Sequence, residues 1–129
     1  MSRLTVNECG QLMVALGWTQ LREANRKWYG TTPDGVRSSL GAWFEEVDNL
    51  GLLGLKRADQ LIKERGLPLG GLFFETMMTL NVVTTTFEID STNSSDTWQF
   101  SSSSSMGVPG AETAATARAI INMIKELTE

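Results

Sequence analysis

The sequence predicts an α/β (mixed α+β) protein with a helical N-terminal half, a small sheet and a closing C-terminal helix. Three observations predict this class. Apolar residues recur with helical spacing in the first half of the chain, alternate with polar residues from Val83 to Asp90, and return to helical spacing after Ala111. The small sheet is expected to contain a β-hairpin at about residues 82–103.

The chain has the size of a single domain. Its 129 residues are 41% hydrophobic and 20% charged, which is ordinary for a folded protein. The longest apolar stretch, residues 67–74, is too short to span a bilayer, and the first residues lack the apolar segment of a signal peptide. We therefore expect one cytosolic domain over residues 1–129, with no membrane partner. The final helix reaches the end without a terminating glycine, so we also expect this domain to be the ordered core of a longer chain.

Two absences exclude most catalytic chemistry. The chain has no histidine, which excludes Ser-His-Asp and Cys-His nucleophiles and imidazole acid–base catalysis. Its single cysteine, Cys9, excludes internal disulfides and sites built from several thiolates. Carboxylates with lysine, or carboxylates holding magnesium, are the remaining options. We expect no enzymatic activity, no cofactor and no small-molecule substrate.

The charges are unevenly distributed along a chain whose net charge is −4. Residues 1–66 hold nine Lys/Arg and eight Asp/Glu, a sum of +1, whereas residues 67–129 hold two and seven, a sum of −5. An acidic chain binds nucleic acid poorly as a whole, because phosphates repel it. A local basic face in the first half remains able to contact a phosphate backbone, although solvated helix surfaces account for the same charges.

The first helix has a clear start signal. Thr5 and Glu8 have the spacing of a capping box, and Leu4 and Cys9 fall at the positions of a hydrophobic staple. Cys9 is therefore expected to be a small core residue. Gly17 is suited to end this helix in a left-handed conformation.

Two further helices are predicted before residue 50. The first runs from Thr19 to Gly30, and its basic residues next to aromatic ones fit either a nucleic-acid grip or the polar face of an amphipathic helix. These basic residues are Arg22, Arg26 and Lys27, beside Trp28 and Tyr29.

The second of these helices opens at Thr32-Pro33-Asp34, where a cap, a proline and a carboxylate follow one another. Its apolar stripe is Val36, Leu40, Trp43, Phe44, Val47 and Leu50. Glu45, Glu46 and Asp48 lie off this stripe, where they fit a solvated flank better than a magnesium site.

Residues 50–62, read as LGLLGLKRADQLI, resemble a helix-hairpin-helix element, in which two short helices meet at a Gly-hydrophobic-Gly turn. Gly54 and Ala58 keep the spacing of that family, but the turn is one residue longer. The resemblance implies phosphate contacts by the basic residues of this segment, through the start of a helix. A plain packing joint between helices explains the pattern equally well. The candidate nucleic-acid-binding residues here are Lys56, Arg57, Lys63 and Arg65.

The segment between residues 67 and 103 carries the strand signals. After a turn-rich joint, residues 72–80 are apolar all round and remain ambiguous between helix and strand. In the hairpin, a pairing with index sum 187 places Phe87 opposite Phe100 and Ile89 opposite Trp98. On the opposite face, Glu88 and Asp90, with Asp96 from the turn, are the best metal candidates, but they lack the pattern of a calcium loop.

The last element is an amphipathic helix from about Ala111. It follows a serine-rich loop and a Gly-Val-Pro-Gly turn. Its apolar stripe consists of Ala114, Ala117, Ile120, Ile121, Ile124 and Leu127.

As a whole, the chain resembles the minor inner-capsid protein of the double-stranded RNA bacteriophages, the cystoviruses. The likeness extends through TTPDGVRSSLGAWFEEVDNL and from the serine run into GVPGAETAATARAIINMIKEL. It implies a non-enzymatic structural protein of the virion inner core, assembled in the host cytoplasm, which assists assembly of the polymerase complex and packaging of single-stranded RNA precursors. The implied partners are a second copy in a homodimer, the viral polymerase, the capsid shell proteins and single-stranded RNA. No site residue is carried over from the family.

Two other functions stay open from the residues alone. One is a helix-hairpin-helix type nucleic-acid-binding module over residues 50–65, and the other is a magnesium-dependent enzyme that uses Glu88, Asp90 and Asp96.

Overall fold

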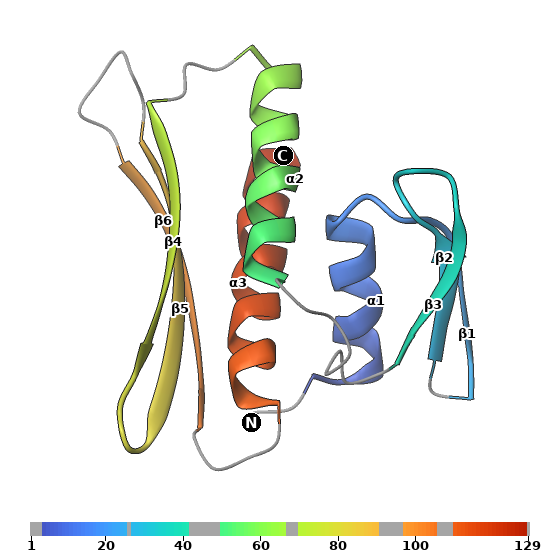
Figure 1. Ribbon diagram of the computed structural model, residues 1–129, viewed down its shortest axis with the longest axis horizontal. Coiled ribbons are helices and arrows are strands. Elements are labelled where there is room, and N and C mark those ends of the chain that lie inside the picture. The colour runs from blue at the N-terminus through green and yellow to red at the C-terminus, as the bar shows by residue number, and fades with distance from the viewer. Residues whose placement is uncertain are drawn as a thin grey trace.

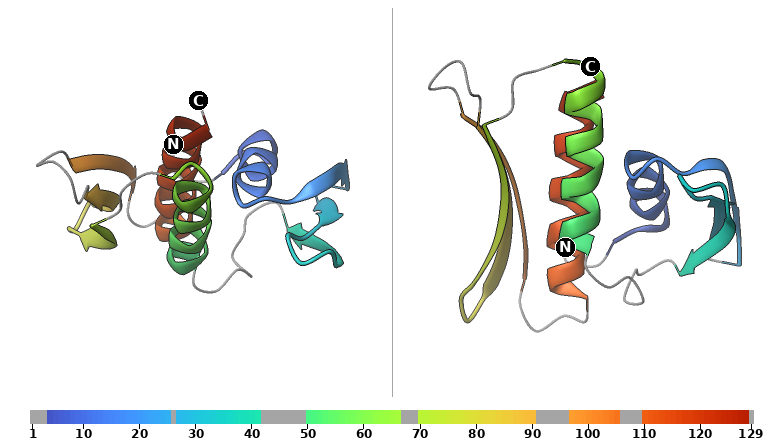
Figure 2. Two further views of the ribbon diagram at one scale, coloured as in Figure 1. Left: turned by 90° about the horizontal axis from the view of Figure 1, so that it is seen from above. Right: turned by 45° about the horizontal axis from the view of Figure 1, so that its top comes forward.

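The computed structural model describes residues 4–25, 27–41, 50–66, 70–90, 97–105 and 110–128. Its layers follow one another across the molecule: the sheet β4–β5–β6, the helix pair α2 and α3, the helix α1, and the sheet β1–β2–β3 (Figures 1 and 2). The elements are α1 (Val6–Ala15), β1 (Thr19–Ala24), β2 (Lys27–Thr31), β3 (Arg37–Gly41), α2 (Leu50–Glu64), β4 (Gly71–Met78), β5 (Val82–Asp90), β6 (Thr97–Ser105) and α3 (Ala111–Thr128). The mixed α+β class is confirmed, but the helical N-terminal half is wrong, because α1 is followed by the three strands β1, β2 and β3.

Helix α1 begins and ends as the sequence predicts. The Glu8 amide donates to Thr5 Oγ1 at 3.1 Å, and the Thr5 amide donates to Glu8 Oε1 at 3.0 Å, which completes the capping box. Leu4 and Cys9 are both buried at the start of the helix. Gly17 has φ +92°, a conformation that favours glycine and lets the chain turn away from the helix end.

The predicted helix at 19–30 is a β-hairpin of β1 and β2. Ala24 pairs with Lys27, and Asn25 has φ +52°, so the connection is a tight turn with a left-handed residue that asparagine tolerates. The Trp28 indole nitrogen donates to Val6 O of α1 at 2.9 Å. A Cβ on Gly10 would lie 2.6 Å from the Trp28 ring, so this glycine admits the indole against α1. This tertiary contact fixes a strand where periodicity favoured a helix.

The predicted helix starting at Thr32-Pro33-Asp34 is also wrong, because these residues turn the chain from β2 into β3. The Gly35 amide donates to Thr32 O at 2.9 Å, and the Thr32 amide donates to Val36 O at 2.9 Å. Gly35 has φ +86°. A proline, an aspartate and a left-handed glycine form a tight hairpin turn, and this competes with the helix-cap interpretation of the same residues. The rest of that predicted helix, with Glu45, Glu46 and Asp48, lies outside the described residues.

The predicted helix-hairpin-helix turn does not form, since α2 is one uninterrupted helix from Leu50 to Glu64. Gly51 and Gly54 are both buried within it. A Cβ on Gly51 would lie 2.4 Å from the Phe74 ring, and one on Gly54 would lie 2.7 Å from Ile120 Cγ1. The glycines therefore allow close packing against β4 and α3 instead of reversing the chain.

The second sheet confirms the predicted hairpin, but the predicted serine-rich loop is wrong, because residues 101–105 belong to β6 and pair with β5. Phe87 pairs with Phe100, and Ile89 pairs with Trp98, as the index sum of 187 requires. Residues 91–96, the predicted turn, lie outside the described part. The ambiguous segment before the hairpin is the strand β4, which pairs with β5 along its whole length, Gly71 opposite Asp90 and Met78 opposite Val83.

The main hydrophobic core lies between the helices and one face of β5. Helix α3 matches its predicted start and packs against α1, α2, β5 and β6. The buried strand residues Phe87 and Ile89 meet the buried stripe of α3, including Ile120. Over the described residues, no helix is both long and apolar enough to cross a membrane.

Candidate interaction surface

Strand β4 is the most exposed apolar feature of the described chain. The order of its sheet is β4–β5–β6, so β4 is an edge strand that pairs with β5 on one side only. Its sequence, GLFFETMM, is apolar on both faces of the sheet. The exposed fractions are 54% for Phe73, 40% for Phe74, 62% for Met77 and 53% for Met78. Side chains of this kind are usually covered in a folded protein.

The two faces of β4 have different surroundings. Phe74 stacks on Phe87 with ring centroids 5.5 Å apart, and it covers Gly51 of α2. On the outer face, Phe73 pairs with Glu88 and Met77 pairs with Thr84, so the cross-strand neighbours of both are polar. Leu80, in the turn after β4, is 95% exposed and extends the apolar edge. We call Phe73, Phe74, Met77, Met78 and Leu80 the β4 edge.

The outer face of β5 and β6, by contrast, is polar and bonded across the strands. Thr84 and Ser103 hydroxyls lie 2.7 Å apart, and those of Thr86 and Ser101 lie 2.8 Å apart. These cross-strand pairs stabilise the register of the hairpin without apolar contact. The apolar outer surface of the sheet is thus concentrated on β4, with the exposed Val82 at the start of β5 beside it.

The predicted metal candidates belong to the same polar face. Gln99 Nε2 donates to Glu88 Oε1 at 2.8 Å, and the Thr97 hydroxyl donates to Asp90 Oδ1 at 3.1 Å. Asp96 lies outside the described residues. Within those residues, no group of three or more Cys, Asp or Glu side chains is arranged to hold a metal ion. The two described carboxylates act in strand pairing.

The basic residues of α2 are divided between solvent and internal contacts. Arg57 Nε donates to Ala15 O at 3.1 Å, and Arg65 donates to Leu127 O, so both link α2 to other helices. Lys63 forms an ion pair with Asp59 at 2.9 Å. Lys56 is exposed, and among described residues it has no side-chain partner.

The basic residues of the first hairpin belong to β1 and β2, which lie in a different layer of the fold from α2 (Figure 1). The Arg22 guanidinium lies 5.4 Å from the Tyr29 ring centroid, and Lys27 is exposed. Arg26 lies outside the described residues. The described candidate nucleic-acid residues therefore come from two separate layers of the fold.

A partly buried ion pair joins the two ends of the chain. Arg118 Nε of α3 donates to Glu8 Oε2 of α1 at 2.8 Å, and Arg118 Nη1 donates to Ser104 Oγ of β6 at 3.3 Å. The hydrogen bond from Arg118 lowers the pKa of Glu8 below 4.5, with burial opposing the shift and Thr5 assisting it. The pair connects α1 and β6 to α3.

No protein-family model, curated protein or solved structure matches the chain. The sequence identified the apolar character of residues 72–80 but not their position at a sheet edge. Only the strand order reveals that position, because the same apolar pattern is typical of a buried strand.

Proposed function

We propose that the protein is a non-enzymatic component of a viral inner core that acts through contacts with other macromolecules. In this role it assists assembly of the polymerase complex and packaging of single-stranded RNA precursors. Its partners are a second copy of the chain, the polymerase and the shell proteins, with single-stranded RNA as a further ligand. The likeness to the minor inner-capsid protein of the double-stranded RNA bacteriophages supports this role.

The exposed β4 edge is the observation that carries the proposal. An edge strand presents unpaired backbone groups, and soluble proteins normally protect such strands with charges, prolines or bulges. Within Gly71–Met78 the only charged residue is Glu75, and there is no proline. The edge is therefore suited to pair with another strand.

A second copy of the chain satisfies this edge directly. Antiparallel pairing of β4 with β4 of the second copy about a two-fold axis would join the two sheets into one. The same contact would cover Phe73 and Met77, each of which stabilises association by about 1–2 kcal/mol when fully buried. The homodimer would then present one continuous sheet to other core components.

Light scattering coupled to size exclusion tests the association. We expect the wild-type chain at micromolar concentration to have twice the mass of 14.2 kDa. The double variant Phe73→Lys/Met77→Lys should have the single mass, because lysines on an edge strand oppose pairing. Val36→Lys is the matched control, since Val36 is 59% exposed and lies outside β4. A monomeric wild type, or a double variant as dimeric as the control, would contradict the proposal.

Reconstitution tests the function itself. Purified polymerase, shell protein and single-stranded RNA are combined with the wild-type chain, the β4 double variant or Val36→Lys. The wild type and the control should raise the yield of RNA-filled particles, and the double variant should not. Equal yields with and without the wild-type chain would reject the assembly role.

A further inference from the structure

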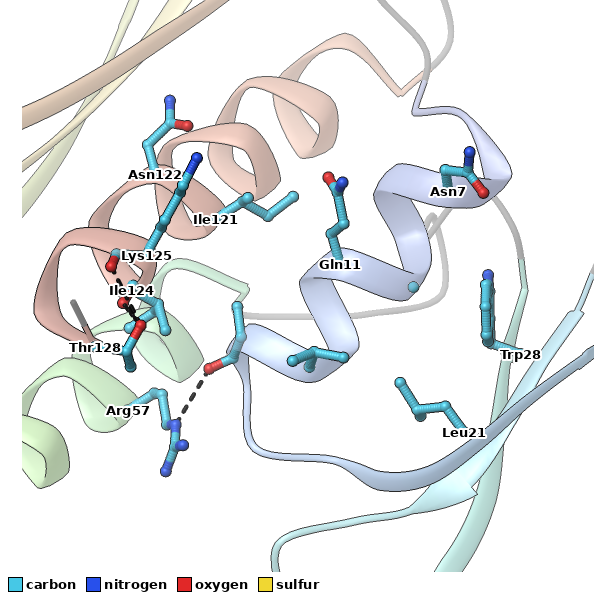
Figure 3. A pocket seen from close by; sticks show the side chains of 13 residues that line it. Asn7, Gln11, Leu21, Trp28, Arg57, Ile121, Asn122, Ile124, Lys125 and Thr128 are labelled. Atoms are coloured by element: carbon cyan, nitrogen blue, oxygen red, sulfur yellow. Dashed lines mark hydrogen bonds between the residues drawn. The ribbon is translucent and has the colours of Figure 1, made fainter.

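A second apolar surface lies far from β4, on the other side of the α2–α3 layer. It is a groove of about 1060 Å³ between α1, the C-terminal half of α3 and the hairpin β1–β2 (Figure 3). Leu21 and Trp28 line one end, and Ile121 and Ile124 line the wall formed by α3. This volume is at the upper end of the range of small-ligand sites, and the lining extends over α1, α3 and the hairpin, which leaves room for a polypeptide segment.

Helix α1 exposes an apolar side chain into this groove. Val14 is 60% exposed, although its neighbours Met13 and Ala15 are buried. Gly10, one turn earlier, has no side chain, so the half-buried Trp28 ring packs directly on α1 and lines the same wall. A contact along α1 would therefore bury Val14 and the exposed part of the indole together.

The charge of the groove is opposite to that of the chain. The charged residues among its lining are Arg57 and Lys125, both basic, in a chain of net charge −4. Arg57 is held at the groove by its bonds to Ala15 O at 3.1 Å and Gln60 Oε1 at 3.0 Å. Lys125 is exposed on the last turns of α3. This end of the groove is complementary to carboxylates.

The walls favour a helical occupant. α1 and α3 bond their own backbone groups internally, so these two walls offer no strand edge to an extended peptide. The third wall includes the edge strand β1, whose register is interrupted between Thr19 and Arg22, where Gln20 has φ +53°, so it is a poor template for a further strand. A helix satisfies its own backbone and presents apolar residues at i, i+3, i+4 and i+7. Gln11 and Asn122, exposed at the rim in Figure 3, offer amide groups to the polar flank of such a helix.

We propose that this groove binds an amphipathic, acidic helix of a partner protein, with its apolar side chains on Val14, Trp28 and Ile121 and its carboxylates beside Arg57 and Lys125. The inference does not depend on the function of the β4 edge, because the two surfaces share no residue.

The probe for this site is a fluorescently labelled 14-residue peptide of leucine and glutamate, with leucines at helical spacing. Anisotropy should show saturable binding below about 1 mM, and a peptide with lysine in place of glutamate should bind at least about tenfold more weakly. The double variant Phe73→Lys/Met77→Lys should bind like the wild type, which separates this site from the β4 edge. Absent binding, or equal binding of the two peptides, would overturn the proposal.

Matched variants locate the contact. Val14→Asp should weaken binding at least about tenfold, because it places a carboxylate against the leucines of the peptide. Val36→Asp should not weaken binding, because Val36 is as exposed as Val14 but lies outside the groove. Lys125→Glu should weaken binding about three- to tenfold, and Lys56→Glu should have less than a twofold effect. Equal effects within either pair would overturn the proposed site. Displacement of the peptide by a single-stranded RNA oligonucleotide, with the same order of variants, would assign the groove to RNA and reject the peptide.

Discussion

Replacing Glu8 by glutamine or by alanine tests its two contacts, the local one with Thr5 and the long-range one with Arg118. Its carboxylate accepts from the Thr5 amide in the capping box and from Arg118 in the ion pair. Glutamine can still accept from Thr5 but has no charge for Arg118, whereas alanine has neither contact. The two variants therefore differ by the capping contact and by the neutral acceptor oxygen that glutamine still offers to Arg118.

The structure sets the expected magnitudes. The side chains of Arg118 and Glu8 are 16% and 25% exposed, so solvent screens their interaction only in part. Loss of the charged contact should lower the free energy of unfolding by about 1 kcal/mol in Glu8→Gln. Glu8→Ala also removes a capping contact and leaves the guanidinium with fewer acceptors, so it should cost about 2–3 kcal/mol.

The pH dependence follows from the lowered pKa of Glu8. The hydrogen bond from Arg118 favours the charged form in the folded state, so the unfolded chain binds the proton at higher pH than the folded chain. The resulting stability is fully present above 4.5, the ordinary pKa from which that of Glu8 is lowered. It is lost as the pH falls through the lower folded pKa. The difference in the free energy of unfolding between the wild type and Glu8→Gln should thus become smaller below about pH 4.5.

Urea unfolding followed by circular dichroism, from pH 7 down to pH 3, measures these differences. Glu126→Gln, an exposed position on α3, is the control and should change the free energy by less than about 0.5 kcal/mol. If the free energy of unfolding of Glu8→Ala is as high as that of this control, the reasoning is refuted. So would a difference between wild type and Glu8→Gln that stays constant across the acid range.

Two glycine substitutions test the corrected elements. Gly54→Ala should lower the free energy of unfolding by about 1 kcal/mol, because the clash with Ile120 outweighs the gain in helix propensity. If urea unfolding shows a more stable variant instead, α2 is loosely packed at this position. Gly35→Ala meets no atom within 4 Å, yet it should also cost about 1 kcal/mol because φ is +86°; an unchanged urea midpoint would contradict the left-handed turn.

Local sequence signals are sufficient to predict the elements whose structure is determined by residues close together in the sequence. The capping box at Thr5 and Glu8 depends on atoms three residues apart, and the hairpin register of Phe87 with Phe100 follows from strict alternation. The last helix was found because its apolar stripe extends over several turns. In these segments, propensity, pattern and packing agree.

The wrong secondary-structure predictions concern segments in which contacts between residues distant in sequence determine which of two local structures forms. Leu21, Ala24 and Trp28 fit a helical face, but the turn at Asn25 and the bond from Trp28 to Val6 O place them on a hairpin. Gly51 and Gly54 suggest a turn in sequence, and only the packing of Phe74 and Ile120 explains them inside a helix. Periodicity in a short segment cannot include such contacts.

The same limit applies to the candidate surfaces. The groove combines Val14, Trp28, Arg57 and Lys125, which come from four elements. No spacing in the sequence connects them. The β4 edge likewise depends on strand order, which the apolar pattern of residues 72–80 does not encode.

Amide hydrogen exchange of β4 across a protein concentration series tests the central claim most directly, since it reports on the edge strand of the unmodified chain. Backbone amides within Gly71–Met78 that do not bond to β5 should exchange fast in dilute solution and become protected as the concentration rises, while those of β2 stay unchanged. If exchange in β4 is independent of protein concentration, and added polymerase and shell protein do not change it, the claim that the protein acts through this edge is contradicted.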